Sequence, residues 1–226
     1  MAEEAKPRVT LETIQNDPHV VAYMEMGDEY LGAIGYTEHG MRHGNLVAHI
    51  SGQILSRLGY DERTAELGSI AGFMHDIGNC IGREMHGISS ALLAKDVLYH
   101  QGMEPHEIVR VMNALGNHEE EFGAPANPIG SATIIADKSD VHHTRVRNLD
   151  PATFDIHDRV NYAAKRSFLR VDPETRLLTL EIDIDTEISQ VMEYFEIFLS
   201  RMQMCRKAAR VLDATFSLVI NGIRLL

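Results

Sequence analysis

The sequence predicts a mainly α-helical fold, a helical bundle that carries a small C-terminal α+β appendage. Up to about residue 165, apolar residues recur at the three- and four-residue spacing of helices, and several of these runs begin at a capping residue. Later the pattern alternates, returns to a helical period, and reaches Asn221-Gly222, a strong turn signal. We therefore expect a helical body over 1–165 and an appendage over 166–226 packed on it.

Three helices are expected in the first third of the chain. Asp17 before Pro18 is a capping residue followed by the proline that is favoured at the first helical position. Thr37 and Asp61 predict the starts of two more helices. The expected helices cover about 18–33, 38–58 and 62–76, and the last one ends at the dipeptide His75-Asp76.

Four further helices complete the expected body. Gly102 ends one helix and Pro105 begins the next, while Asn127-Pro128 repeats the signal of a cap before proline. Asp155 caps a shorter helix. The expected ranges are about 86–100, 105–115, 129–145 and 156–165.

The appendage is predicted as a β-hairpin, a long helix and a terminal β-hairpin. Residues 167–171 and 177–184 alternate between apolar and polar around a turn-forming segment. Residues 188–212 have a helical period, and their aromatic and methionine stripe fits either the core or the seam of a homodimer. Residues 215–220 and 223–226 flank Asn221-Gly222.

Composition excludes several classes of function. The chain has 226 residues and a net charge of -12, so a general nucleic-acid-binding surface, which needs lysines and arginines against phosphates, is not expected. Cys80 and Cys205 form no CxxC motif, which excludes a disulfide framework or a thiolate zinc site. No apolar run reaches the length of a membrane span, and the N-terminus lacks the pattern of an export signal. We expect a cytoplasmic protein.

The dipeptide His75-Asp76 is the centre of the functional prediction. It follows a run of apolar residues with the spacing of a buried helix face, and a buried carboxylate needs a compensating charge, for which a divalent cation is the strongest candidate. Other helices can bring further ligands to it. The six residues expected to meet are His43, His75, Asp76, His86, His118 and Asp137. Four imidazoles with two carboxylates suit Fe, Mn, Zn or Ni better than Mg or Ca.

The order of these ligands, H, HD, H, H, D, resembles that of the HD-domain metal-dependent phosphohydrolase superfamily. The resemblance spans about 36–147 and includes the segments His43-Gly44-Asn45-Leu46-Val47-Ala48, Met74-His75-Asp76-Ile77-Gly78, His86-Gly87-Ile88, Asn117-His118-Glu119 and Ala136-Asp137-Lys138-Ser139-Asp140. It implies an HD-domain helical bundle for the body. Relatives often place a lysine three residues after the HD pair, where this chain has Asn79.

The resemblance also implies how metal would be held. His43, His75, Asp76 and Asp137 would bind one ion. His86 and His118 would bind a second, with Asp76 bridging the two. The expected cofactor is one or two divalent transition-metal ions per chain, with Fe or Mn favoured and Zn, Ni or Co as alternatives.

Cationic residues near Asp137 are candidates for binding an anionic substrate. His142, Arg145 and Arg147 follow it closely, and arginine forks match phosphate oxygens. The alternative is that these cations only complement a helix C-terminus. His39 lies one turn before His43 on the expected helix, where a substrate contact is one interpretation and simple exposure another. Lys138 and Asp140 are candidates for contact with substrate or water, or for a structural ion pair.

The sequence thus predicts a metal-dependent phosphohydrolase. It would cleave a phosphoester or phosphoanhydride of a phosphorylated small molecule or nucleotide through metal-activated hydroxide. We assign catalytic roles to Asp76, Lys138 and Asp140. Two alternatives share the ligand set: a mixed-valent di-iron oxygenase, and a nucleotide sensor without catalysis.

Overall fold

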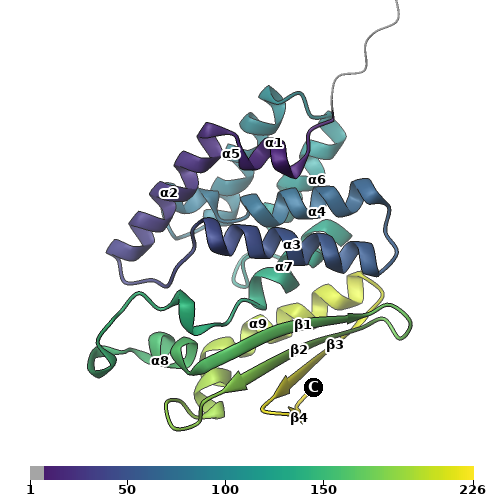
Figure 1. The fold of residues 1–226 in the computed structure, drawn as a ribbon. Coiled ribbons are helices and arrows are strands. Elements are labelled where there is room, and N and C mark those ends of the chain that lie inside the picture. Colours follow the sequence, from purple (N-terminus) through teal and green to yellow (C-terminus); the bar gives the residue numbers. More distant parts are fainter. Residues whose placement is uncertain (1–7) are drawn as a thin grey trace, which may run out of the picture.

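The computed structural model describes residues 8–226, in which a helical body lies on a smaller sheet-containing layer (Figure 1). Residues 1–7, on which the expectation of no export signal rests, lie outside this range. None of the described helices is long and apolar enough to cross a membrane. The mainly helical fold with a small C-terminal α+β part agrees with the prediction.

The helical body follows the expected order. Its helices are α1 (Leu11–Gln15), α2 (Pro18–Ala33), α3 (Met41–Arg57), α4 (Glu62–Met74), α5 (His86–His100), α6 (Pro105–Gly116) and α7 (Pro128–Lys138). Short 3-10 helices cover Ile77–Cys80, His143–Arg145 and Pro151–Thr153. The side chains of Asp17, Asp61 and Asn127 accept hydrogen bonds from the first turns of α2, α4 and α7, as their sequence positions predict.

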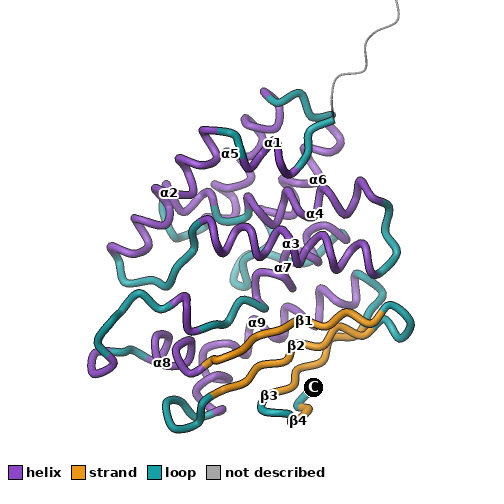
Figure 2. The backbone as a smooth tube through the Cα atoms, in the orientation of Figure 1, coloured by secondary structure: helices purple, strands orange, loops and turns teal. Residues whose placement is uncertain are grey.

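The remaining elements build one sheet with a helix on its face (Figure 2). They are α8 (Ile156–Ala163), β1 (Ala164–Asp172), β2 (Leu177–Ile184), α9 (Val191–Val211), β3 (Thr215–Ile220) and β4 (Ile223–Arg224). The strand order is β1-β2-β3-β4, and β2 and β3 are parallel while the other neighbours are antiparallel. Both expected hairpins form, but β3 returns beside β2 through the crossover helix α9 and joins them.

Several expected boundaries were wrong. The second helix starts at Met41 instead of residue 38, because the Glu38 carboxylate accepts from the Gly40 amide and Asp28 accepts from the His39 amide, which holds this segment outside the helix. The helix expected over 129–145 ends at Lys138, where the Ser139 hydroxyl donates to the carbonyl of Ala136. α8 ends at Ala163, because the next residue begins β1. The short helix α1 was not expected.

A continuous apolar core joins the appendage to the body. Ile54 of α3 and Ile135 of α7 belong to the same buried cluster as Leu180 of β2 and Phe198 of α9. Tyr194, Phe198 and Met202 of the α9 stripe are buried in this core. The stripe therefore packs inside the chain, while a homodimer through α9 and the division at residue 165 stay predictions.

Candidate metal centre

Five helices of the body bring the six predicted ligands to one point. His43 comes from the first turn of α3, and His75 and Asp76 follow the end of α4. His86 begins α5, His118 follows α6, and Asp137 lies in the last turn of α7. Because glycines let these helices approach closely, a Cβ on Gly72 would lie only 2.8 Å from the Val47 carbonyl of α3. The convergence thus depends on tight packing between α3 and α4.

The first group of side chains contains two histidines and two carboxylates. Nε2 of His43 lies 3.2 Å from Nε2 of His75 and 3.4 Å from Oδ1 of Asp137. Nε2 of His75 lies 3.4 Å from Oδ2 of Asp76. All four residues are buried or nearly so, and Nε2 of each histidine lies within 3.8 Å of an oxygen of each carboxylate.

A second group is formed around the other carboxylate oxygen of Asp76. Oδ1 of Asp76 lies 3.0 Å from Nε2 of His86 and 3.6 Å from Nε2 of His118. The two imidazole nitrogens are 3.1 Å apart. Asp76 therefore faces one group with each of its oxygens, which is the arrangement of a bridging carboxylate.

The far nitrogen of each histidine is held by an acceptor. Nδ1 of His43 donates to Oδ2 of Asp140 at 2.8 Å. For His75, His86 and His118, Nδ1 donates to the backbone carbonyls of Gly72, Arg83 and Leu115, at 2.8, 2.9 and 2.7 Å. With the proton on Nδ1, each Nε2 can offer a lone pair to a cation at the centre, although His86, whose pKa is raised to about 9, must lose a second proton to do so. This second layer of hydrogen bonds is the usual way in which proteins orient imidazole ligands.

The donor set fits one or two divalent transition-metal ions. Bonds of about 2.1 Å that meet at a right angle place neighbouring ligand atoms about 3 Å apart, close to the separations seen here. Without a cation, lone pairs of His43 and His75 would face each other beside two ionised carboxylates. The chemistry of the cluster therefore calls for positive charge at its centre.

The electrostatics of the carboxylates agree with this. Burial acts to raise the pKa of Asp76, but the neighbouring histidines, foremost His75, outweigh it and hold this pKa well below its usual range. Burial opposes ionisation of Asp137 too, yet the ammonium of Lys138 keeps its pKa well below the ordinary value. Burial acts to lower the pKa of His86, whereas hydrogen bonds to Asp76 and Glu119 raise it to about 9. The ionised carboxylates of the cluster therefore stabilise positive charge beside them.

A cavity of about 860 Å³ opens onto the cluster. Asp76, His86, His118 and Asp137 lie on its wall. A second cavity of about 290 Å³ shares several of its lining residues, namely Tyr36, His39, Arg83, Arg145 and Arg201. The two are parts of one depression, in which the cluster occupies one end.

Three of the other predicted residues line this depression. Lys138 is buried, and its ammonium lies 2.6 Å from Asp137 and 3.3 Å from Glu120. His39 donates from Nδ1 to the carbonyl of Thr37, and burial together with Arg145 lowers its pKa well below the usual value. His39 is therefore neutral at neutral pH. Arg145 is only 3% exposed, and its guanidinium donates to the carbonyls of Glu38 and Asp140.

The remaining three predicted residues do not line it. Asp140 lies behind His43, accepts its Nδ1 proton and holds this imidazole in place. Arg147 pairs with Asp28 at the surface. His142 caps the short 3-10 helix that follows and lines a different cleft. The end of α7 at Lys138 explains these positions, because the chain turns away there.

Sequence reasoning missed two arginines of the cavity. Arg83 lines both parts of the depression, and its guanidinium lies 3.3 Å from the side-chain oxygen of Asn79 and 5.4 Å from the ring centre of Tyr36. Arg83 thus supplies a cation beside the position where relatives carry lysine. Arg201 reaches the cavity from α9 and lies 3.0 Å from Glu120. Only the fold could show this contact, because α9 lies outside the motif region.

Comparisons with known proteins give distant matches. No protein-family model matches the chain. An uncharacterized protein of Methanocaldococcus jannaschii is 24% identical over 213 residues, which cover 83% of this chain and 81% of that protein. Ribonuclease Y of Lawsonia intracellularis is 33% identical over 105 residues, which are 46% of this chain and only 18% of the ribonuclease.

A solved structure also resembles part of the chain. The crystal structure of a predicted HD superfamily hydrolase from an uncultured Thermotogales bacterium matches 58% of this chain and 73% of that one, with 22% identity and a TM-score of 0.42. A likeness this distant supports no inference about chemistry, which rests on the side chains of the cluster. The cluster itself is compatible with a metal site of the HD type, as the resemblance in the sequence predicts.

Proposed function

We propose that the protein is a metal-dependent phosphohydrolase that cleaves a phosphoester or phosphoanhydride of a small, nucleotide-like substrate. The observation that carries the proposal is the orientation of four buried imidazoles, each with Nδ1 bound to an acceptor and Nε2 directed at two ionised carboxylates. Imidazoles held in this way can each offer the Nε2 lone pair to a cation between the carboxylates, which is how proteins orient histidine ligands.

The two groups of the cluster assign the ligands. By their distances, His43, His75, Asp76 and Asp137 would hold one ion, and Asp76, His86 and His118 a second. A divalent transition metal bound there would polarise a phosphoryl oxygen and make water nucleophilic at neutral pH. Hydrolysis forms a P–O bond to the water oxygen and breaks the P–O bond to the leaving group, so it needs no oxidant.

The cationic side chains of the depression suit an anionic substrate. Arg83 and Arg201 come from different parts of the chain and line both cavities. Lys138 stays charged, because Asp137 and Glu120 outweigh the effect of burial and raise its pKa. Guanidinium groups on the wall can bind phosphate oxygens and offset charge that develops on them during the reaction.

The shape of the depression supports a nucleotide-like substrate. Tyr36 and Phe122 line the larger cavity and are 43% and 59% exposed, so flat apolar groups are available beside the cationic ones. The match to ribonuclease Y, whose name describes cleavage of a phosphodiester, supports the same bond type. The net charge of -12 favours a small substrate over a long nucleic acid.

The test is metal analysis of protein purified without a chelating tag, combined with a panel of phosphomonoesters, phosphodiesters and nucleoside polyphosphates. We expect bound transition metal and turnover of at least one class, both with and without oxygen. The variant Asp76→Ala should lose metal and activity together, because it removes the side chain that faces both groups. Metal-free protein, full activity of this variant, or turnover that requires oxygen would each contradict the proposal.

A further inference from the structure

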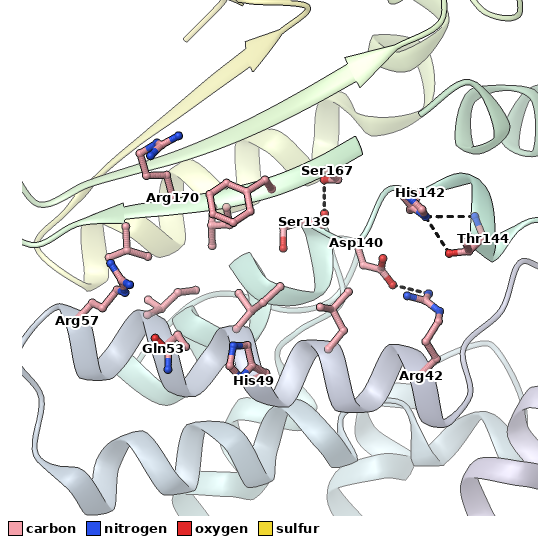
Figure 3. Close-up of a pocket in the computed structure, with 16 residues that line it drawn as sticks. Arg42, His49, Gln53, Arg57, Ser139, Asp140, His142, Thr144, Ser167 and Arg170 are labelled. Carbon is pink, nitrogen blue, oxygen red and sulfur yellow. Dashed lines mark hydrogen bonds and ion pairs between the residues drawn. The ribbon is translucent and has the colours of Figure 1, made fainter. Parts of the chain in front are cut away.

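A second cleft lies between α3 and β1 (Figure 3), and Asp140, which bonds His43 of the metal cluster, lies on its wall. Its volume is about 640 Å³, within the range of small-molecule sites. None of the six metal-ligand candidates lines it. The α3–β1 cleft is therefore separate from the depression described above.

One wall of the cleft is a single face of α3. Arg42, Leu46, Ile50, Gln53 and Arg57 recur at helical spacing along it. The rise of the helix makes this face roughly 22 Å long. The wall therefore has apolar and neutral polar side chains in its middle and an arginine at each end.

The opposite wall is β1, an edge strand of the sheet. Its residues 167–171 line the cleft consecutively, and its other side pairs with β2. Phe168 is 47% exposed, although it sits in a cleft with apolar side chains across from it. The guanidinium of Arg170 lies 5.8 Å from the centre of its ring. An exposed aromatic ring in a concave surface is a common platform for a flat ligand.

Charge in the cleft is opposite to that of the whole chain. Arg57 and Arg170 lie at the same end on opposite walls (Figure 3). Within residues 8–226, Arg57 has no hydrogen bond or ion pair through its side chain, while Arg170 pairs with Glu181 at the surface. The one carboxylate among the lining residues, Asp140, is already held by Arg42 and His43. Although the chain has a net charge of -12, Arg57 and Arg170 thus give one end of this cleft two arginines that can bind an anion.

We propose that the α3–β1 cleft is a second ligand site, for an aromatic anion of the nucleoside monophosphate class. The anionic group binds Arg57 and Arg170, and the flat part stacks on Phe168 against Leu46 and Ile50. Gln53 and His49 in the middle of the α3 face supply hydrogen bonds to polar edges of the ligand. The proposal does not depend on the hydrolytic function, because it uses none of the metal-site residues.

The test is calorimetric titration of the full-length protein with adenosine monophosphate, with adenosine and inorganic phosphate as the separate halves of the probe. We expect adenosine monophosphate to bind more tightly than either half. Arg57→Gln and Arg170→Gln should each weaken binding by tenfold or more, and Phe168→Ala should weaken binding of adenosine monophosphate without changing that of phosphate. Arg224→Gln is the matched control, because it removes an exposed arginine of β4 that lines no described cleft.

The variant Arg83→Gln separates the two sites. Binding that survives Arg83→Gln but is lost in Arg57→Gln supports the proposal. Binding that is lost in Arg83→Gln and kept in Arg57→Gln places the nucleotide in the metal-site depression and overturns it. A third result also overturns it: if Arg57→Gln lowers the melting temperature but leaves affinity unchanged, Arg57 serves only the C-terminal end of α3. No detectable binding of adenosine monophosphate up to about 1 mM would also overturn the proposal.

Discussion

A single oxygen of Asp140 links the metal cluster to the protein behind it: Oδ2 lies 2.8 Å from Nδ1 of His43 and 2.8 Å from a guanidinium nitrogen of Arg42. Asp140 is 3% exposed. Burial acts to raise its pKa, but Arg145, His43 and Arg42 outweigh burial and lower it. The ionised carboxylate therefore fixes which nitrogen of His43 faces the cluster.

The first prediction concerns this contact. Asp140→Asn keeps an oxygen that can accept the His43 proton but removes its charge, so the affinity for divalent metal should fall about tenfold to a hundredfold. Competition with a metal-sensitive dye measures the change. Asp183→Asn, in an exposed carboxylate of β2, is the control and should change nothing. Wild-type metal affinity in Asp140→Asn would show that Asp140 does not position His43.

A second prediction separates the two groups of ligands. His118→Ala should reduce metal content towards one ion per chain, because His43, His75, Asp76 and Asp137 still form a complete group. Elemental analysis of the purified variant gives the number. His100→Ala, in an exposed histidine at the end of α5, should keep the wild-type content. Loss of every ion, or of none, would refute the assignment of His118 to a separate group.

The third prediction tests a structural role for Arg145 beside the substrate contact that the sequence suggests. Its buried guanidinium donates to two backbone carbonyls, so Arg145→Gln should destabilise the fold by about 3 kcal/mol by leaving buried groups unpaired. Arg145→Lys should not restore stability, because an ammonium cannot replace the fork. Thermal or urea unfolding measures both variants. Arg147→Gln removes a partly exposed ion pair and should cost less than about 1 kcal/mol. If Arg145→Gln had wild-type stability, the structural role would be refuted and substrate binding would be the remaining interpretation of Arg145.

A fourth prediction assigns substrate binding to Arg83. Arg83→Gln should lower kcat/KM by about tenfold or more on a substrate that the protein hydrolyses, with metal content unchanged. His86 bonds through Nδ1 to the backbone carbonyl of Arg83, which a side-chain substitution retains, while the guanidinium lies 3.3 Å from its Nε2. Arg83→Lys should recover part of the loss, since it keeps the charge. Arg110→Gln on α6 serves as the control, and equal kinetics of the Arg83→Gln and control variants would exclude the role.

Much of the metal centre could be predicted from the sequence, because its ligands lie in short segments whose residue types and order are distinctive. The structure brings His43 and Asp137, which are 94 residues apart, to 3.4 Å from each other, as the pattern predicts. The acceptors behind the ligands were harder to predict. Three of the four histidines donate from Nδ1 to a backbone carbonyl. Every residue carries a carbonyl, so only the fold reveals which one lies within hydrogen-bond distance.

The positions of the candidate substrate-binding residues were predicted less well, for a physical reason. Periodicity extended α7 to residue 145 and would have placed Arg145 on the helix beside Asp137. Instead, Ser139 ends the helix through its bond to the Ala136 carbonyl, and Arg145 folds back to Glu38. Where a helix ends depends on competition between helix propensity and hydrogen bonds from nearby side chains to the backbone. The spacing of apolar residues carries no information about these hydrogen bonds. Arg201 was missed because a contact across chain segments leaves no local pattern.

The parallel pairing of β2 with β3 has a consequence for synthesis. The ribosome makes the chain from its N-terminus, so all six ligands leave the tunnel before α9 and β3 exist. Ile54 and Ile135, which belong to the same buried cluster as residues of the sheet and α9, stay exposed to solvent or to chaperones during that interval. Chains stalled on the ribosome before residue 191 should therefore be cut by a protease faster than chains released after β3 has paired.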